Sequence, residues 1–104
     1  MSYLVRLLPA VYKGVTESKK WYNTRQYGLG DAFIAMINKE IELISKNPNH
    51  YQKKYRNLYQ CSVKKFPFAI FYSIDEDLKE ILIFGVLHTK RNPKMIQKRS
   101  KKQL

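Results

Sequence analysis

Two stretches in the second half of the chain have the hydrophobic pattern of paired β-strands. Between residues 68 and 74, FAIFYSI, apolar side chains occupy both of the alternating sets of positions, which is expected of a strand inside a sheet. Three acids, Asp75, Glu76 and Asp77, then interrupt the run. A second apolar run rich in strand formers, ILIFGVL, follows at 81–87. The pattern predicts two antiparallel strands joined by an acidic turn.

The chain begins with the pattern of a strand followed by a helix. The apolar run YLVRLL at 3–8 is ended by Pro9, which predicts an N-terminal strand. Apolar residues then recur at helical spacing over 11–22. Gly14 lies inside this segment and weakens the predicted helix, because glycine is a poor helix former.

A second helix is predicted after the glycine-containing link at 27–30. Its apolar stripe repeats at intervals of four, four and three residues, at Phe33, Ile37, Ile41 and Ile44. Asp31, beside the glycines, is expected to cap its first turn. Asn47-Pro48 should end the helix near Lys46, since proline disfavours helical geometry in the residue before it.

These elements predict one α+β domain: a small antiparallel β-sheet with an N-terminal helical hairpin packed on one face, in the order β-α-α-β-β-β. The first of the last three strands, within 55–63, rests mainly on the need to extend the sheet. Tyr51, Tyr55 and Tyr59 recur there at four-residue spacing, which also permits a short helical turn. We assign 1–93 to the domain and predict that 94–104 forms a basic, mobile tail, because its charges repel one another.

The positive charge of the chain predicts that the domain binds an acidic partner. The formal net charge is +12, and residues 52–104 hold thirteen Lys/Arg against four Asp/Glu. A surface of this sign attracts polyanions, so nucleic acid and an acidic protein are the candidate partners. The alternative is that lysine is simply abundant. A membrane surface is not favoured, because the sequence has no amphipathic anchor and no apolar run of about 18 residues.

Cysteine usage predicts a reducing, cytoplasmic setting. Cys61 is the single cysteine, so it forms no internal disulfide and is expected to be a packing residue. No Cys/His cluster has the spacing of a zinc site. We therefore predict no metal and no cofactor.

The motifs of common enzymes are absent from the sequence, with no glycine-rich phosphate loop and no Ser-His-Asp pattern. Glu40 and Glu42 fall on the polar side of the second helix and are expected to be solvated. The remaining catalytic candidates are His88 and Arg91, since a histidine can move a proton and an arginine can bind a phosphate through two hydrogen bonds. The alternative is that His88 only ends a strand and that Arg91 is solvated.

The chain resembles the RelE/ParE superfamily of toxins from bacterial type II toxin-antitoxin modules, also called plasmid stabilisation proteins. The resemblance covers most of the sequence and rests on an ordered set of motifs rather than on any one of them. These are Trp21-Tyr22, Gly28-Leu29-Gly30-Asp31 with Phe33, Asn47-Pro48, Lys65-Phe66-Pro67-Phe68 with Ile70-Phe71-Tyr72, and Val86-Leu87-His88 followed by Arg91-Asn92-Pro93. The family's small antiparallel sheet with a helical hairpin agrees with the order derived above.

The resemblance implies a growth-inhibiting toxin that is neutralised by a cognate, acidic, partly disordered antitoxin. The ParE-like branch acts on DNA gyrase, and the RelE-like branch cleaves mRNA on the ribosome. The sequence is closer to the ParE-like branch, because no tyrosine follows Tyr72 and the position after the last strand reads Thr89-Lys90. In an mRNA interferase, His88 would be the general acid or base. Residues that stabilise charge or bind nucleic acid would be Arg56, Lys64, Lys65, Lys90 and Arg91.

In a ParE-like toxin the same residues would form a binding surface without catalysis. Whether the protein is an enzyme therefore stays open at this point, as does a monomeric or dimeric state of the toxin alone. A third reading is a non-catalytic RNA-binding protein, supported by charge and by eight tyrosines. This reading predicts no toxicity and no acidic partner gene alongside.

Overall fold

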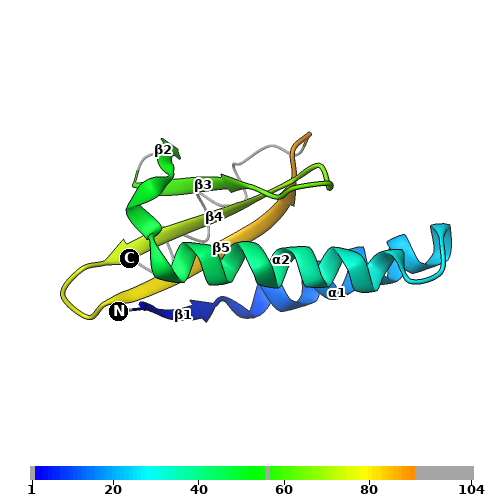
Figure 1. Cartoon of the computed structure of the whole chain (residues 1–104), viewed down its shortest axis with the longest axis horizontal. Coiled ribbons are helices and arrows are strands. Elements are labelled where there is room, and N and C mark those ends of the chain that lie inside the picture. The colour runs from blue at the N-terminus through cyan, green and yellow to red at the C-terminus, as the bar shows by residue number, and fades with distance from the viewer. Residues whose placement is uncertain (1, 56, 91–104) are drawn as a thin grey trace.

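The protein forms two helices packed on a five-stranded, mostly antiparallel sheet (Figure 1). The structure, a computed structural model, describes residues 2–55 and 57–90, apart from the side chain of Tyr55. The tail predicted at 94–104 lies outside these residues. In chain order the elements are β1 (Leu4–Leu7), α1 (Pro9–Arg25), α2 (Leu29–Lys46), the 3-10 helix η1 (Pro48–His50), β2 (Gln52–Tyr55), β3 (Leu58–Ser62), β4 (Phe68–Asp75) and β5 (Glu80–His88).

The sheet order is β1-β5-β4-β3-β2, with β1 parallel to β5 and every other pair antiparallel. The predicted α+β class and the predicted hairpin of β4 and β5 are confirmed. β2 was not predicted: it pairs with β3, so these two strands form a second hairpin where the tyrosine spacing also permitted a helical turn. None of the helices described for this chain is long and apolar enough to cross a membrane.

The acidic turn between β4 and β5 closes as its composition predicts. The Leu78 backbone N–H donates to Asp75 Oδ1 at 3.0 Å, which fixes the turn through a side chain. Lys79 has φ of 53°, in the left-handed region, and reverses the chain into β5. The strands then pair from Asp75 with Glu80 to Phe68 with His88. His88 is thereby placed at the far end of the sheet from the turn.

The two helices start differently. Pro9 begins α1, where its missing N–H has no cost. α2 begins at Leu29, preceded by Gly28 with φ of 79°, which only glycine adopts freely. The prediction that Asp31 caps α2 is wrong, because the left-handed turn at Gly28 starts the helix earlier. Asp31 lies in the first turn and forms an ion pair with Lys19 across the hairpin, at 3.6 Å.

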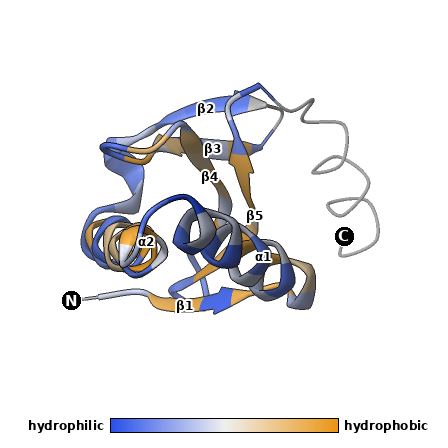
Figure 2. Ribbon diagram, turned by 90° about the vertical axis from the view of Figure 1, so that its right-hand side faces the viewer, coloured by the Kyte–Doolittle hydropathy of each residue, from blue (hydrophilic) through white to orange (hydrophobic). Residues whose placement is uncertain are grey.

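The core lies between the helical hairpin and one face of the sheet, and Figure 2 shows α1 and α2 side by side on that face. Phe33 on α2 is fully buried among the rings of Tyr22, Phe66 and Phe68, with centroids 4.9 to 5.3 Å away. Aromatic rings in such edge and tilted contacts stabilise the core beyond their buried area. The cluster therefore joins both helices to β4 near the end of the sheet that carries His88.

Glu40 corrects a prediction about α2. It was expected to be solvated, but its side chain is 3% exposed, whereas Glu42 is exposed as predicted. Glu40 lies three residues after Ile37 and four before Ile44, so it belongs to the same helical face as these buried residues. The buried stripe passes through Glu40, and Ile41 lies at its half-buried margin.

Candidate functional site

His88, the predicted acid or base, is half-buried at the end of β5. Its ring packs edge-on against Phe68, with centroids 5.4 Å apart, and its Nδ1 accepts a hydrogen bond from the Lys90 backbone N–H at 3.1 Å. An Nδ1 that accepts carries no hydrogen, so the neutral ring has its hydrogen on Nε2. His88 therefore holds the chain at its exit from β5, and Nε2 is the ring nitrogen that can donate to another molecule.

Lys65 and Lys90 are exposed at the same end of the sheet as His88. Lys65 belongs to the loop between β3 and β4 and has φ of 70°, in the left-handed region. The Thr89 backbone N–H donates to the Pro67 carbonyl at 2.8 Å, which ties this loop to the residues that follow β5. This bond holds the loop that carries Lys65 beside the segment that carries His88 and Lys90, although the two are distant in sequence.

Among the other predicted site residues, the structure describes Lys64. Lys64 lines a different hollow, of about 640 Å³, together with His50, Lys54 and Glu40. Arg56 and Arg91 lie outside the described residues. Of the predicted site residues, the structure thus places Lys65 and Lys90 near the exit from β5 with His88, and Lys64 in another hollow, and their roles stay predictions.

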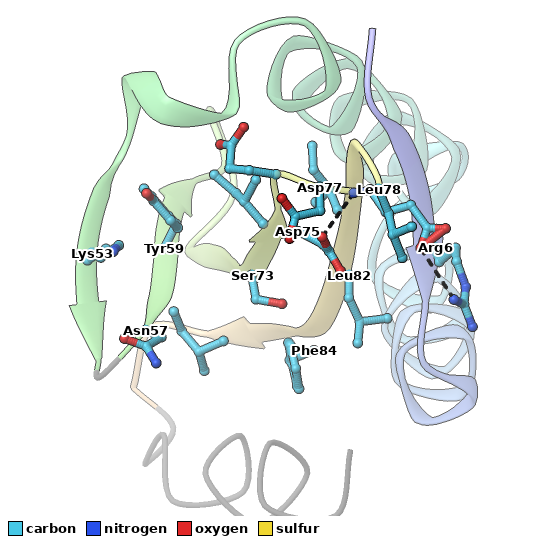
Figure 3. Close-up of a pocket in the computed structure, with 15 residues that line it drawn as sticks. Arg6, Lys53, Asn57, Tyr59, Ser73, Asp75, Asp77, Leu78, Leu82 and Phe84 are labelled. Atoms are coloured by element: carbon cyan, nitrogen blue, oxygen red, sulfur yellow. Dashed lines mark hydrogen bonds and ion pairs between the residues drawn. The ribbon is translucent and has the colours of Figure 1, made fainter. Parts of the chain in front are cut away.

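Figure 3 shows a further hollow, of about 690 Å³, between β1, the β4–β5 turn and β2. Arg6 and Lys53 are its described basic residues. Acidic residues outnumber them in the lining, which also includes Asp75, Glu76, Asp77 and Glu80. Arg6 is paired with Glu80 at 3.6 Å. This hollow is therefore poorly suited to bind the phosphate backbone of a nucleic acid, since its acidic side chains would repel the phosphates.

A smaller groove, of about 270 Å³, runs between α1 and the end of β5. Its α1 wall includes Gly14 and Trp21, and His88 closes one part of it. Buried apolar residues from the sheet form its floor: Phe68, Val86 and Leu87. We refer to this feature as the α1–β5 groove. It was not predicted, because its two walls lie more than fifty residues apart in the sequence.

Trp21 stands beside this groove as a half-exposed aromatic residue. Its side chain is 53% exposed, and the Arg25 guanidinium lies 4.7 Å from the centre of its ring. A cation placed over an indole face is attracted by the ring's quadrupole, and Arg25 thereby orders the exposed ring. Large exposed aromatic residues of this kind are enriched where proteins bind one another.

Glu40 and Cys61 form a buried polar pair between α2 and β3. The Cys61 thiol donates to Glu40 Oε2 at 3.3 Å, and no described group bonds to the buried Oε1. Burial raises the pKa of the Cys61 thiol to about 12, and the hydrogen bond to Glu40 adds to the rise. Among residues 2–55 and 57–90, no three His, Cys, Asp or Glu side chains gather as metal ligands would.

Folded protein is expected to resist alkylation at Cys61. With the pKa near 12, the thiolate fraction at about pH 8 is on the order of one in ten thousand, and the side chain is buried. Mass spectrometry after iodoacetamide treatment should find native protein unmodified and urea-unfolded protein fully modified. Rapid modification of native protein would contradict the buried position of Cys61.

Comparison with known proteins decides the family. The model of the ParE toxin of the type II toxin-antitoxin system parDE matches residues 5–93. The chain belongs to the ParE toxin family. The RelE/ParE resemblance of the sequence is thereby confirmed, and the matched range includes the Gly28 turn, Phe33 and His88. No curated protein sequence matches the chain.

Solved structures agree on the fold of this ParE-family chain. The chromosomal ParDE system from P. aeruginosa is similar with a TM-score of 0.73 and 10% identity, covering 84% of this chain and 96% of the other. A mutant of the E. coli toxin RelE in the free state has a TM-score of 0.72 and 11% identity, and the match covers 100% of each chain. The toxin-antitoxin complex RelBE2 from Mycobacterium tuberculosis has a TM-score of 0.60 and 17% identity, and the match covers 85% of this chain and 99% of the other. At these identities the likeness is one of fold.

Proposed function

We propose that this ParE-family toxin inhibits growth by acting on DNA gyrase in the cytoplasm, and that a cognate acidic antitoxin holds it inactive. The observation that carries the choice of target is the placement of His88. Its ring packs on Phe68 at the apolar α1–β5 groove, while the predicted cation Lys64 lines a different hollow. Cleavage of RNA needs a general acid or base and cations around one phosphate, and Lys64, one of the predicted cations, lines another hollow than His88.

Charge supports the antitoxin part of the proposal. A formal net charge of +12 on 104 residues attracts a flexible acidic chain, which can fold over a wide surface as it binds. The P. aeruginosa ParDE system and the M. tuberculosis RelBE2 complex are both described as toxin-antitoxin assemblies. A shared fold makes the same kind of partner a reasonable expectation for this chain.

The proposal is tested by inducing the protein in cells and measuring DNA breaks, the SOS response and transcript integrity together. We expect growth arrest with DNA breaks that disappear in cells carrying a gyrase resistant to the toxin, and intact messages. With purified components, the toxin should trap gyrase on DNA as a cleaved complex.

A different result would assign the RelE-like activity instead. Messages cleaved on ribosomes, with cleavage lost in His88→Ala, would overturn the gyrase assignment and make His88 a catalytic residue. A protein that arrests no growth and has no acidic partner encoded beside it would contradict the toxin assignment and favour a plain RNA-binding protein.

A further inference from the structure

Gly14 stands inside α1, where nothing within the described chain requires a glycine. Glycine in a helix interior costs about 1 kcal/mol relative to alanine. Its φ is not positive, so the backbone does not demand it. A Cβ built on Gly14 would meet no described atom within 4 Å, so close packing does not demand it either. Gly30 differs, since a Cβ there would overlap the Lys19 carbonyl oxygen of the facing helix.

The missing side chain of Gly14 leaves open the α1–β5 groove. Val11, Gly14, Ser18 and Trp21 follow one another at intervals of three, four and three residues, so they share the face of α1 that lines the groove. A larger residue at position 14 would project into this space. The groove's volume of about 270 Å³ is below the roughly 300–1,000 Å³ of small-molecule pockets, which favours a side chain of a larger partner.

The lining and the surrounding charge indicate the chemistry of that partner. The floor is apolar, and Trp21 offers a half-exposed aromatic wall. Around it α1 carries four basic residues, Lys13, Lys19, Lys20 and Arg25, against the single acid Glu17. Lys90, just beyond His88, and Lys65, in the β3–β4 loop bonded to the residues after β5, are both exposed. An apolar side chain carried by an acidic segment fits both the floor and the rim.

We propose that the α1–β5 groove receives an apolar anchor residue from the acidic antitoxin, and that Gly14 keeps the groove open for it. This inference rests on the proposed function, because its occupant is the antitoxin. The helix stability lost at Gly14 is then the cost of a binding surface and not a packing requirement of the toxin itself.

Gly14→Leu tests the inference, with Thr16→Leu as a matched control on the same helix. Thr16 is exposed and lines none of the three hollows described above. The probe is the purified antitoxin encoded by the neighbouring reading frame, titrated by calorimetry. We expect Gly14→Leu to weaken its binding about ten-fold or more, and Thr16→Leu to bind like the unchanged toxin. Leucine is the better helix former, so Gly14→Leu should melt at a higher temperature, which separates lost binding from lost folding.

The remaining outcomes each decide between alternatives. Equal binding by Gly14→Leu and by unchanged toxin would overturn the inference while leaving the proposed function intact. If Gly14→Leu keeps antitoxin binding but no longer arrests growth, the groove serves the target and the antitoxin assignment is wrong. If the unchanged toxin binds no antitoxin, the proposed function itself fails, and the inference with it.

Discussion

Gly30→Ala is expected to lower the free energy of unfolding by about 2–3 kcal/mol. The new methyl group would overlap the carbonyl oxygen of Lys19 and come 2.7 Å from the Asn23 side chain. The Lys19 carbonyl oxygen is part of the α1 backbone, so the clash can be relieved only if the two helices move apart. That movement would also break the bond from the Gly30 backbone N–H to Asn23 Oδ1, 2.7 Å long, which satisfies an N–H in the first turn of α2.

Urea unfolding followed by circular dichroism measures this effect. Gly14→Ala is the matched control, because the same substitution in α1 meets open space and should raise the free energy of unfolding by about 1 kcal/mol. The two changes are thus expected to have opposite signs. An unchanged or increased stability of Gly30→Ala would refute the close approach of α1 and α2 at this residue.

Glu40→Met is expected to raise the free energy of unfolding by about 1–3 kcal/mol. The Glu40 carboxylate is buried, its Oε1 has no described partner, and its Oε2 accepts only from a thiol, which is a weak donor. Methionine has a similar shape and no polar group that requires a partner. Cys61 keeps a second acceptor, the Ser62 carbonyl oxygen at 3.7 Å, so the substitution does not leave the thiol without a hydrogen-bond acceptor.

Glu42→Met provides the control for this prediction on the same helix. Glu42 is exposed and pairs with Lys46 at 3.2 Å, and exposed pairs contribute little, so its change should stay within about 0.5 kcal/mol. Both variants are compared with unchanged protein by urea unfolding. A loss of stability in Glu40→Met would show that the carboxylate is better satisfied than its described contacts indicate. A gain would mean that the chain retains a buried acid at a cost in stability, as functional positions often do.

The sequence predicted the elements whose signals are local. β4, β5 and α2 carry continuous apolar patterns bounded by turn residues, and these predictions are confirmed. β2 was missed because its sequence, QKKY, is polar and shows no alternation of a buried face. Such an edge strand is defined by its pairing with β3, which sequence pattern does not report.

Side chains were harder to place than elements. Glu40 was assigned to the solvated face by its residue type, although its spacing from Ile37 and Ile44 already put it on the buried stripe. For the candidate site, the exit from β5 was predicted to carry His88 and Lys90, and the structure places both there. The α1–β5 groove depends on tertiary packing, and its only signal in the sequence was an unexplained glycine in a helix at position 14.

The parallel pairing of β1 with β5 has a consequence for how a newly made toxin matures. Leu4 pairs with Glu80 and Leu7 with Ile83, so β1 cannot take its place in the sheet until β5 has been made. Contacts so distant in sequence form late, because closing a long loop costs entropy before the contact repays it. A domain folding during synthesis would therefore hold β1 unpaired until β5 has been made. The sheet can close only after β5 has left the ribosome, when a co-produced partner can already be present.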